Sequence, residues 1–321
     1  QKGDIRGSIA KRVLAGDGEL YERRGCESAA DICATEVRIA GRKVVISSQP
    51  TLFRTYGGVD FAVEICEDLW SPVPPSNILT LAGAKIIFNL SASDELIGKH
   101  TYLRSLVSQQ SARTLSAYVY SCCGFGESTQ DVVYGGNAMI YENGRSIAEG
   151  ERFSLTSQLV ISQIDVEMLE KERLFNTTFR SAANIKDVRI VEAHGISTKD
   201  FELIRTINPH PFIPQNEDMK ASCDEIFSIQ VAGLAKRLTH TNSRNVVLGI
   251  SGGLDSTLAL LVCVKTFDKL GLPREGVIGV TMPGFGTTDR TYNNAVSLMQ
   301  SLGVTIKEIS IGPAVKQHFS D

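Results

Sequence analysis

The stretch 246–256 constrains the fold more than any other part of this chain. Residues 246–250 are apolar and branched, which predicts a short buried strand of a parallel sheet. Ser-Gly-Gly then interrupts the run, and Ser256 begins a second apolar run that predicts a helix. A strand, a tight glycine turn and a helix make an anion site. The turn exposes backbone N–H groups, and the helix N-terminus carries about half a positive charge.

Asp255 indicates which kind of anion this site receives. A carboxylate next to a phosphate is favourable when Mg²⁺ bridges the two, so we expect a pyrophosphate-bearing nucleotide with Mg²⁺. The loop is neither G-x-x-x-x-G-K-[ST] nor G-x-G-x-x-G. Ser251-Gly-Gly-Leu-Asp-Ser256 resembles the loop of the ATP pyrophosphatases, which adenylate a substrate and release pyrophosphate. The alternative is an ordinary strand-to-helix turn.

The residues around this loop predict a doubly wound parallel sheet. Strands and helices alternate, which favours right-handed crossovers, and ligands of such sheets bind at the carboxyl ends of the strands. The expected strands are 246–250, 277–282 and 304–311, and the expected helices are 218–239, one from 256 onward, and 290–302, capped by Thr288-Asp289.

The stretch 61–70 is the second informative one. An apolar strand delivers Cys66 into a cluster of acids formed by Glu64, Glu67 and Asp68. A buried structural cysteine is not normally ringed by carboxylates, whereas a nucleophilic cysteine at a strand end can be, if a nearby cation offsets them. From these residues alone, a nucleophile and a half-buried thiol both stay open.

The remainder of the first 190 residues predicts a sheet-rich layered domain, because strands alternate with few long helices. Asn143-Gly144 predicts the turn of a hairpin. Periodicity weakens from residue 176, and 208–214 is rich in proline, so we predict domains over 1–190 and 218–321 joined by a linker, 191–217. The expected strands of the first domain are 35–39, 43–47, 61–65, 85–90, 117–122, 137–141, 146–148 and 158–164, with a helix within 96–117.

Composition sets the class of protein. The length of 321 residues fits two domains, and 42% hydrophobic with 21% charged residues is typical of a globular chain. The net charge of −3 gives no reason to expect nucleic acid or a membrane as partner. Seven cysteines without a Cys-x-x-Cys motif favour a reducing cytoplasm over a disulfide framework or a structural zinc. Both ends of the chain look like cuts through a longer protein.

The motifs, taken together and in order, resemble the glutamine-dependent NAD⁺ synthetases. That family joins a nitrilase-like glutamine amidohydrolase domain, an α-β-β-α sandwich, to an ATP pyrophosphatase-type synthetase domain. The resemblance implies that both domains are partial here. The motifs that carry it are Glu64-Ile-Cys66-Glu67-Asp68, Asn89-Leu-Ser-Ala-Ser93, Gln110-Ser-Ala-Arg-Thr-Leu-Ser-Ala-Tyr-Val-Tyr120, Tyr141-Glu-Asn-Gly144, Gly249-Ile-Ser-Gly-Gly-Leu-Asp-Ser256 and Met282-Pro-Gly-Phe285.

The resemblance implies a Glu–Lys–Cys triad in the first domain. Cys66 matches the nucleophile that forms a glutamyl thioester, and Lys11 matches the triad lysine. Glu19 matches a second, supporting glutamate, while the general base would precede residue 1. A lysine ammonium beside the thiol favours the thiolate and the developing oxyanion.

Three further positions match residues that bind glutamine. Glu67 and Ser93 match positions that hold the substrate, and Lys99 stands where some members have arginine. Two departures occur near Lys11: Ala10 replaces a proline, and Asp17 replaces an aromatic residue that helps to close the glutamine pocket.

The resemblance implies an ATP site with Asp255 as a Mg²⁺ ligand, and further catalytic residues after Asp321. The family adenylates nicotinic acid adenine dinucleotide, and ammonia from glutamine displaces AMP to give NAD⁺. We expect small-molecule substrates and a homo-oligomer. The positions that match the ATP site are Ser251, Gly252, Gly253, Leu254, Asp255, Ser256 and Met282.

Three alternatives stay open. A plain amidase of the nitrilase superfamily has no use for the Ser-Gly-Gly-Leu-Asp-Ser loop, and a GMP- or asparagine-synthetase type of amidotransferase uses a different glutaminase domain. The third alternative is a fragment that folds or binds nucleotide without turnover. We expect little or no NAD⁺ synthesis from the 321-residue chain alone.

Overall fold

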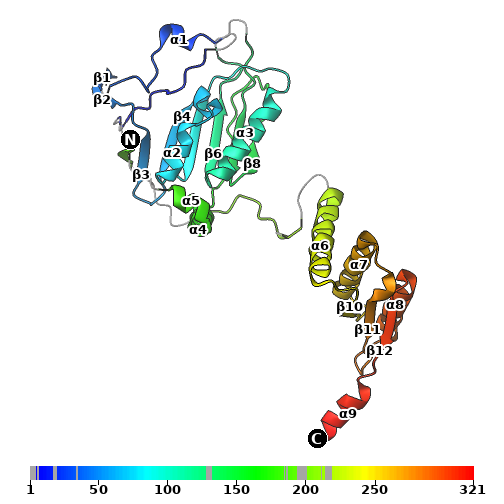
Figure 1. Cartoon of the computed structure of the whole chain (residues 1–321). Coiled ribbons are helices and arrows are strands. Elements are labelled where there is room, and N and C mark those ends of the chain that lie inside the picture. Colours follow the sequence, from blue (N-terminus) through cyan, green and yellow to red (C-terminus); the bar gives the residue numbers. More distant parts are fainter. Residues whose placement is uncertain are drawn as a thin grey trace. The chain divides into compact units, whose positions relative to one another are not determined.

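The chain forms two compact units, Gln1–Ile207 and Asn208–Asp321. Each combines helices with a sheet, which confirms the prediction of a two-domain α/β chain (Figure 1). No helix in the described ranges is both long and apolar enough to cross a bilayer. The computed structural model describes residues 5, 7–16, 20–33, 35–127, 132–183, 185, 187–193, 201–210, 212–213 and 219–321.

A seven-stranded mixed sheet forms the centre of the first unit, in the order β8-β7-β6-β5-β4-β3-β9. The neighbours β4, β5 and β6 are parallel, as are β3 and β9, and the other pairs are antiparallel. A separate hairpin pairs β1 (Thr35–Ile39) with β2 (Arg42–Ile46). The strands of the large sheet are β3 (Thr51–Thr55), β4 (Phe61–Ile65), β5 (Ile86–Ser91), β6 (Ala117–Cys122), β7 (Ala138–Glu142), β8 (Arg145–Glu149) and β9 (Arg189–Ala193).

The turn between β7 and β8 is the one that its sequence predicts. Asn143 and Gly144 have φ angles of 47° and 84°, the left-handed pair that an Asn-Gly hairpin requires. Ala40 and Gly41 adopt the same combination, 48° and 78°, between β1 and β2. Both hairpins therefore confirm the predicted strand pairs.

Helices cover one face of the large sheet. The helix α2 (Pro75–Leu81) packs on β4 and β5, and α3 (Lys99–Arg113) packs on β6, β7 and β8 (Figure 1). On the opposite face Phe61 stacks on Phe53 at 5.0 Å and meets Phe88 edge-on at 5.7 Å, and all three side chains are half-buried. The described residues thus form the helix layer and one sheet of the predicted sandwich.

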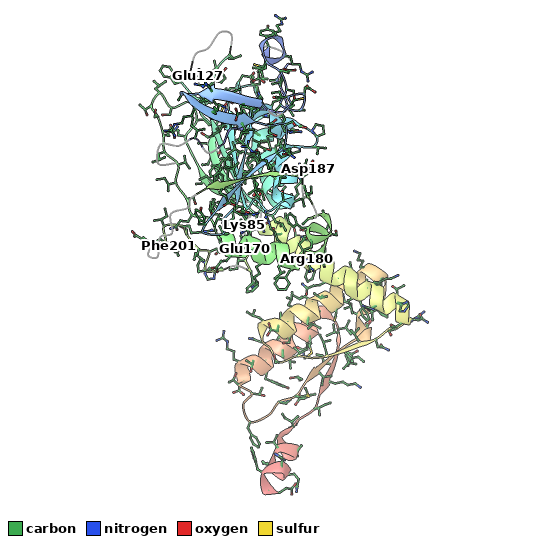
Figure 2. All side chains as sticks on the ribbon, turned by 90° about the vertical axis from the view of Figure 1, so that its left-hand side faces the viewer. Lys85, Glu127, Glu170, Arg180, Asp187 and Phe201 are labelled. Carbon is green, nitrogen blue, oxygen red and sulfur yellow. The ribbon has the colours of Figure 1, made fainter. Side chains whose placement is uncertain are left out.

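Two short helices, α4 (Val166–Phe175) and α5 (Thr177–Ala182), close the end of the unit where β5 and β6 begin. Arg173 on α4 donates three hydrogen bonds to backbone carbonyls there, and burial lowers its pKa to about 10. Lys85 forms an ion pair with Glu170 beside it (Figure 2).

The prediction of a strand over 158–164 is wrong. This segment has no ladder partner in the described structure, and Leu159 is 84% exposed. The side chain of Gln163 instead bonds the backbone of Glu202 and Ile204. Apolar alternation indicates a strand only where a neighbouring strand completes the ladder.

The first residues of the predicted linker, 191–217, belong to β9, and the two compact units divide farther along, inside that linker. Arg205, which lies within the predicted linker, is held to the rest of the first unit by a bidentate ion pair with Glu142, at 2.9 and 2.8 Å. Glu142 is buried, so this pair is well shielded from water. The division between the compact units comes after Ile207.

The second unit contains a three-stranded parallel sheet in the order β10-β11-β12. This sequential order is one half of the predicted doubly wound arrangement. The helix α7 packs on β10 and β11, α8 packs on β11 and β12, and α6 packs on α7. The sequence analysis missed α9, which begins with a Gly-Pro pair. The elements are α6 (Met219–Thr241), β10 (Val246–Gly249), α7 (Leu254–Leu270), η2 (Arg274–Gly276), β11 (Val277–Thr281), α8 (Asp289–Leu302), β12 (Thr305–Glu308) and α9 (Gly312–Ser320).

Candidate active site

Cys66 occupies a sharp turn at the carboxyl end of β4. It is the first residue of the 3₁₀-helix η1 (Cys66–Trp70) and has a φ of 49°, a left-handed conformation that costs about 1–3 kcal/mol in a non-glycine residue. The residue is 8% exposed. Surrounding contacts must hold it in this strained geometry, and the turn directs the chain out of the sheet at the position of the thiol.

Asp68 supplies those contacts. Its buried carboxylate accepts hydrogen bonds from the backbone N–H of Ile65 at 2.9 Å, of Val13 at 2.8 Å and of Arg12 at 3.2 Å. Burial raises the pKa of Asp68, and the three amides together with the charge of Lys11 oppose that rise. One carboxylate therefore joins the turn at Cys66 to the segment that carries Lys11.

Lys11 and Cys66 line the same cavity, whose volume is about 410 Å³. The side chain of Lys11 is 13% exposed, and its ammonium donates to both carboxylate oxygens of Glu22, one of them at 2.6 Å. Glu22 begins the short helix α1 (Glu22–Gly25) and also accepts from the N–H of Ala15 at 2.8 Å. The cavity is lined by Lys11, Glu22, Ile65, Cys66, Leu90, Ser91, Ala92, Ser121, Cys122 and Cys123.

Glu22 is the carboxylate that the sequence analysis missed. Glu19, the predicted supporting glutamate, lies outside the described residues, and its role stays a prediction. The two glutamates are three residues apart in one charged stretch, and spacing alone does not show that Glu22 reaches Lys11. Glu22 begins a helix and turns its carboxylate back toward Lys11, an arrangement that the sequence analysis did not include.

The acids next to Cys66 do not surround its thiol as free charges. Glu64 faces the helix layer, where it accepts from the N–H of Ser76 at 2.9 Å and from the hydroxyl of Tyr118. Burial raises the pKa of Glu64, and these two hydrogen bonds lower it. Glu64 and Asp68 both accept hydrogen bonds that stabilise the fold. These two acids of the cluster predicted from the sequence therefore have a structural role.

The three predicted glutamine-binding residues lie near the cavity without lining it in the described structure. Glu67 is half-buried within η1, and Ser93 is 8% exposed, one residue beyond the lining residue Ala92. The ammonium of Lys99 pairs with Asp94 at 2.5 Å and lies 5.4 Å above the ring of Trp70. Lys99 is thus already engaged by its own neighbours.

The glycine loop of the second unit leaves the N-terminus of α7 open. No side chain caps this end of the helix. The hydroxyls of Ser251 and Ser256 lie 3.2 Å apart, and the Ser251 hydroxyl also accepts from the N–H of Gly253 at 3.3 Å. Gly252 has a φ of 82°, and a Cβ there would collide with the carbonyl of Thr291 in α8. The loop therefore needs glycine at this position.

Asp255 and Met282 lie at the same edge of the parallel sheet. Asp255 is exposed in the first turn of α7, beside Leu254. Met282 follows β11, and its terminal methyl lies 3.8 Å from where a Cβ of Gly249 would be. In the described ranges no three acidic, histidine or cysteine side chains gather as a metal site. Asp255 alone would leave most of a cation's ligands to phosphate and water.

Comparison with known proteins places the first unit in a family. Residues 11–173, half of the chain, match the carbon-nitrogen hydrolases. The chain belongs to the carbon-nitrogen hydrolase family. Residues 226–321, which lie in the second unit, match another family, NAD synthase.

Relatives match the chain over nearly its whole length. The glutamine-dependent NAD(+) synthetase of Mycobacterium tuberculosis is 39% identical over 98% of this chain and 47% of its own length. That of Mycobacterium leprae is 38% identical over 97% and 47%. A solved structure, the glutamine-dependent NAD(+) synthetase from Cytophaga hutchinsonii, is 21% identical over 98% of this chain and 48% of that one, with a TM-score of 0.42.

These matches confirm the resemblance that the motifs predict. The chain spans about half the length of the curated relatives it matches.

Proposed function

We propose that this chain carries the amide-hydrolysing and nucleotide-activating parts of a glutamine-dependent NAD⁺ synthetase. The first unit releases ammonia from the side chain of glutamine. The second unit binds ATP for the adenylation of nicotinic acid adenine dinucleotide, whose activated carboxylate then takes up the ammonia. The observation that carries the proposal is the meeting of Cys66 and Lys11 on the wall of one cavity.

Cys66 is the nucleophile in this proposal. Its sulfur bonds to the amide carbon of glutamine, the C–N bond breaks, and the thiol proton leaves with the departing ammonia. Water then hydrolyses the glutamyl thioester and restores the thiol. The left-handed turn at Cys66, held by Asp68, keeps the sulfur at the carboxyl edge of the sheet.

Lys11 stabilises the negative charge that develops on the amide oxygen during the attack. Glu22 fixes the ammonium by accepting from it with both carboxylate oxygens. Since Lys11 is largely buried, its charge acts in a poorly screened environment. Glu67, Ser93 and Lys99 are proposed to contribute to glutamine binding from the rim of this cavity.

In the second unit, residues 251–256 receive the phosphates of ATP at the open N-terminus of α7. Met282, at the same edge of the parallel sheet, contacts the adenosine of ATP. Asp255 fits Mg²⁺ as a single exposed carboxylate, because this ion usually takes one or two carboxylates and completes its shell with phosphate oxygens and water. Bound there, Mg²⁺ neutralises phosphate charge.

The proposal is tested on the protein expressed from its full reading frame, with glutamine or ammonium as nitrogen source. Cys66→Ala should abolish NAD⁺ formation from glutamine and leave formation from ammonium intact. Asp255→Ala should abolish both. Cys33→Ser, at an exposed thiol, is the control and should match the wild type. Synthesis from glutamine by the Cys66→Ala protein would refute the nucleophile assignment.

A further inference from the structure

One wall of the Cys66 cavity is a short segment that leaves the sheet. The strand β5 ends at Ser91, whose carbonyl accepts from the N–H of Cys123 at 3.0 Å. Leu90, Ser91 and Ala92 line the cavity on this side. The ladder with β6 stops at Ser91, and the segment is next held through an isolated bridge between Asp94 and Tyr134.

The thiol of Cys122 holds Ser93, which lies between these two attachments. Its sulfur accepts from the backbone N–H of Ser93 at 3.3 Å and donates to the carbonyl of Ser93 at 3.5 Å. Ser93 is 8% exposed, so its backbone groups need partners within the protein. A cysteine side chain thus continues the ladder by one residue on the wall of the cavity.

Register places Cys122 close to the reacting centre. Ile65 pairs with Leu90, and Ser91 pairs with Cys122, so Cys66, Ser91 and Cys122 follow one another across the carboxyl edge of three parallel strands. Both thiols line the one cavity. The two thiols are separated by two strands, roughly 9–10 Å between backbones, which is too great for a disulfide. Cys66 is the proposed nucleophile, and the second task, hydrogen bonding to Ser93, belongs to Cys122.

The second task requires a neutral thiol. A thiolate has no proton to donate and could not serve the carbonyl of Ser93. Burial raises the pKa of Cys122, with the Ser93 amide opposing that rise. The geometry and the protonation state therefore agree: Cys122 both donates and accepts.

We propose that Cys122 is a positioning residue of the amide-hydrolysing site, which sets Ala92 and Ser93 against Cys66 and so determines how tightly glutamine binds. This inference rests on the proposed function. Cys122→Ala removes both contacts. Cys122→Ser keeps a donor and an acceptor, but hydroxyl hydrogen bonds are shorter than these sulfur contacts, so the serine cannot make both without moving Ser93.

The experiment measures glutamine-dependent and ammonium-dependent NAD⁺ formation by the protein expressed from its full reading frame. Cys122→Ala should raise the KM for glutamine about tenfold, the effect of about one net hydrogen bond, with a smaller change in kcat. Cys122→Ser should give an intermediate KM. Both variants should keep the wild-type rate with ammonium, and the exposed Cys33→Ser should keep both rates.

A second measurement needs no synthesis. Iodoacetamide labelling of Cys66, followed by peptide mass spectrometry, gives the glutamine concentration that protects the thiol. This concentration should rise about tenfold in Cys122→Ala, in step with KM. Far-UV circular dichroism, compared with that of the wild type, reports whether each variant is folded.

The outcomes separate the two proposals. A wild type that uses no glutamine refutes the proposed function, and the inference falls with it. A wild type that uses glutamine, with an unchanged KM in both Cys122 variants, overturns the inference alone. Equal losses with glutamine and ammonium also overturn it, because they indicate a general defect of the fold.

Discussion

Tyr118 and Tyr120 offer a test of how the first unit is stabilised. Both rings are buried on β6, with 0% and 1% of their surface exposed. The hydroxyl of Tyr118 donates to Glu64 and accepts from the side-chain amide of Asn89 at 3.1 Å. The hydroxyl of Tyr120 makes no well-aligned hydrogen bond in the described part of the chain, although the side chains of Ser91 and Cys122 lie close to it. Replacing either residue by phenylalanine therefore removes the same atom from two different environments.

The expected effects differ by several kcal/mol. In Tyr118→Phe, Glu64 and Asn89 each lose a partner, while Glu64 keeps the N–H of Ser76 at 2.9 Å. Each buried group left unpaired costs about 1–3 kcal/mol, so we expect a loss of about 3 kcal/mol in the free energy of unfolding. Tyr120→Phe removes a buried polar atom without a well-aligned hydrogen bond and should lie within about 0.5 kcal/mol of the wild type or be more stable.

Urea denaturation followed by the fluorescence of Trp70 measures the difference. Trp70 packs against the core of the first unit and stacks on Tyr102 at 5.7 Å, so its signal reports this unit. With a slope of about 2 kcal/mol per M, Tyr118→Phe should lower the midpoint by about 1.5 M, and Tyr120→Phe should hardly move it. Equal shifts in the two variants would refute the reasoning, because burial alone would then decide the loss.

Two further predictions concern Glu64 and the glycine loop. Burial raises the folded-state pKa of Glu64 above its ordinary 4.5, so its contribution to stability is complete below pH 4.5 and is lost as pH rises through the raised value. The stability of the wild type relative to Glu64→Gln, followed by Trp70 fluorescence from pH 4 to 8, should fall by up to about 1.4 kcal/mol per pH unit; parallel curves would contradict this. Gly252→Ala should cost more than the roughly 1–2 kcal/mol of Gly271→Ala, because both glycines have positive φ but only Gly252 abuts the Thr291 carbonyl. Thermal unfolding followed by circular dichroism measures both, and equal losses would show that the contact is unimportant.

Local patterns predicted the elements that depend on local physics. The Asn143-Gly144 hairpin follows from two residues that accept positive φ, and the strand–loop–helix at 246–256 follows from an apolar run broken by glycines. Cys66 was placed at a strand end for the same reason. Each of these features is decided within about ten residues, so the sequence alone suffices.

Features that depend on distant partners were missed. The segment 158–164 has the alternation of a strand, yet Gln163 bonds to residues 39 and 41 positions away along the chain instead of joining a ladder. The strand β9 falls across the predicted domain boundary because its partner, β3, lies far upstream. The helix α9 was also missed, although its Gly-Pro start is a local signal that predicts the beginning of a helix.

The candidate site divides in the same way. The sequence by itself determined that a thiol stands at a strand end, and that a glycine loop opens the N-terminus of a helix. Only the tertiary structure decided that Glu22 meets Lys11, that Asp68 binds three backbone amides and that Glu64 turns into the helix layer. The reason is physical: adjacent side chains in one motif leave the backbone in different directions, and their partners come from segments that only the fold brings together.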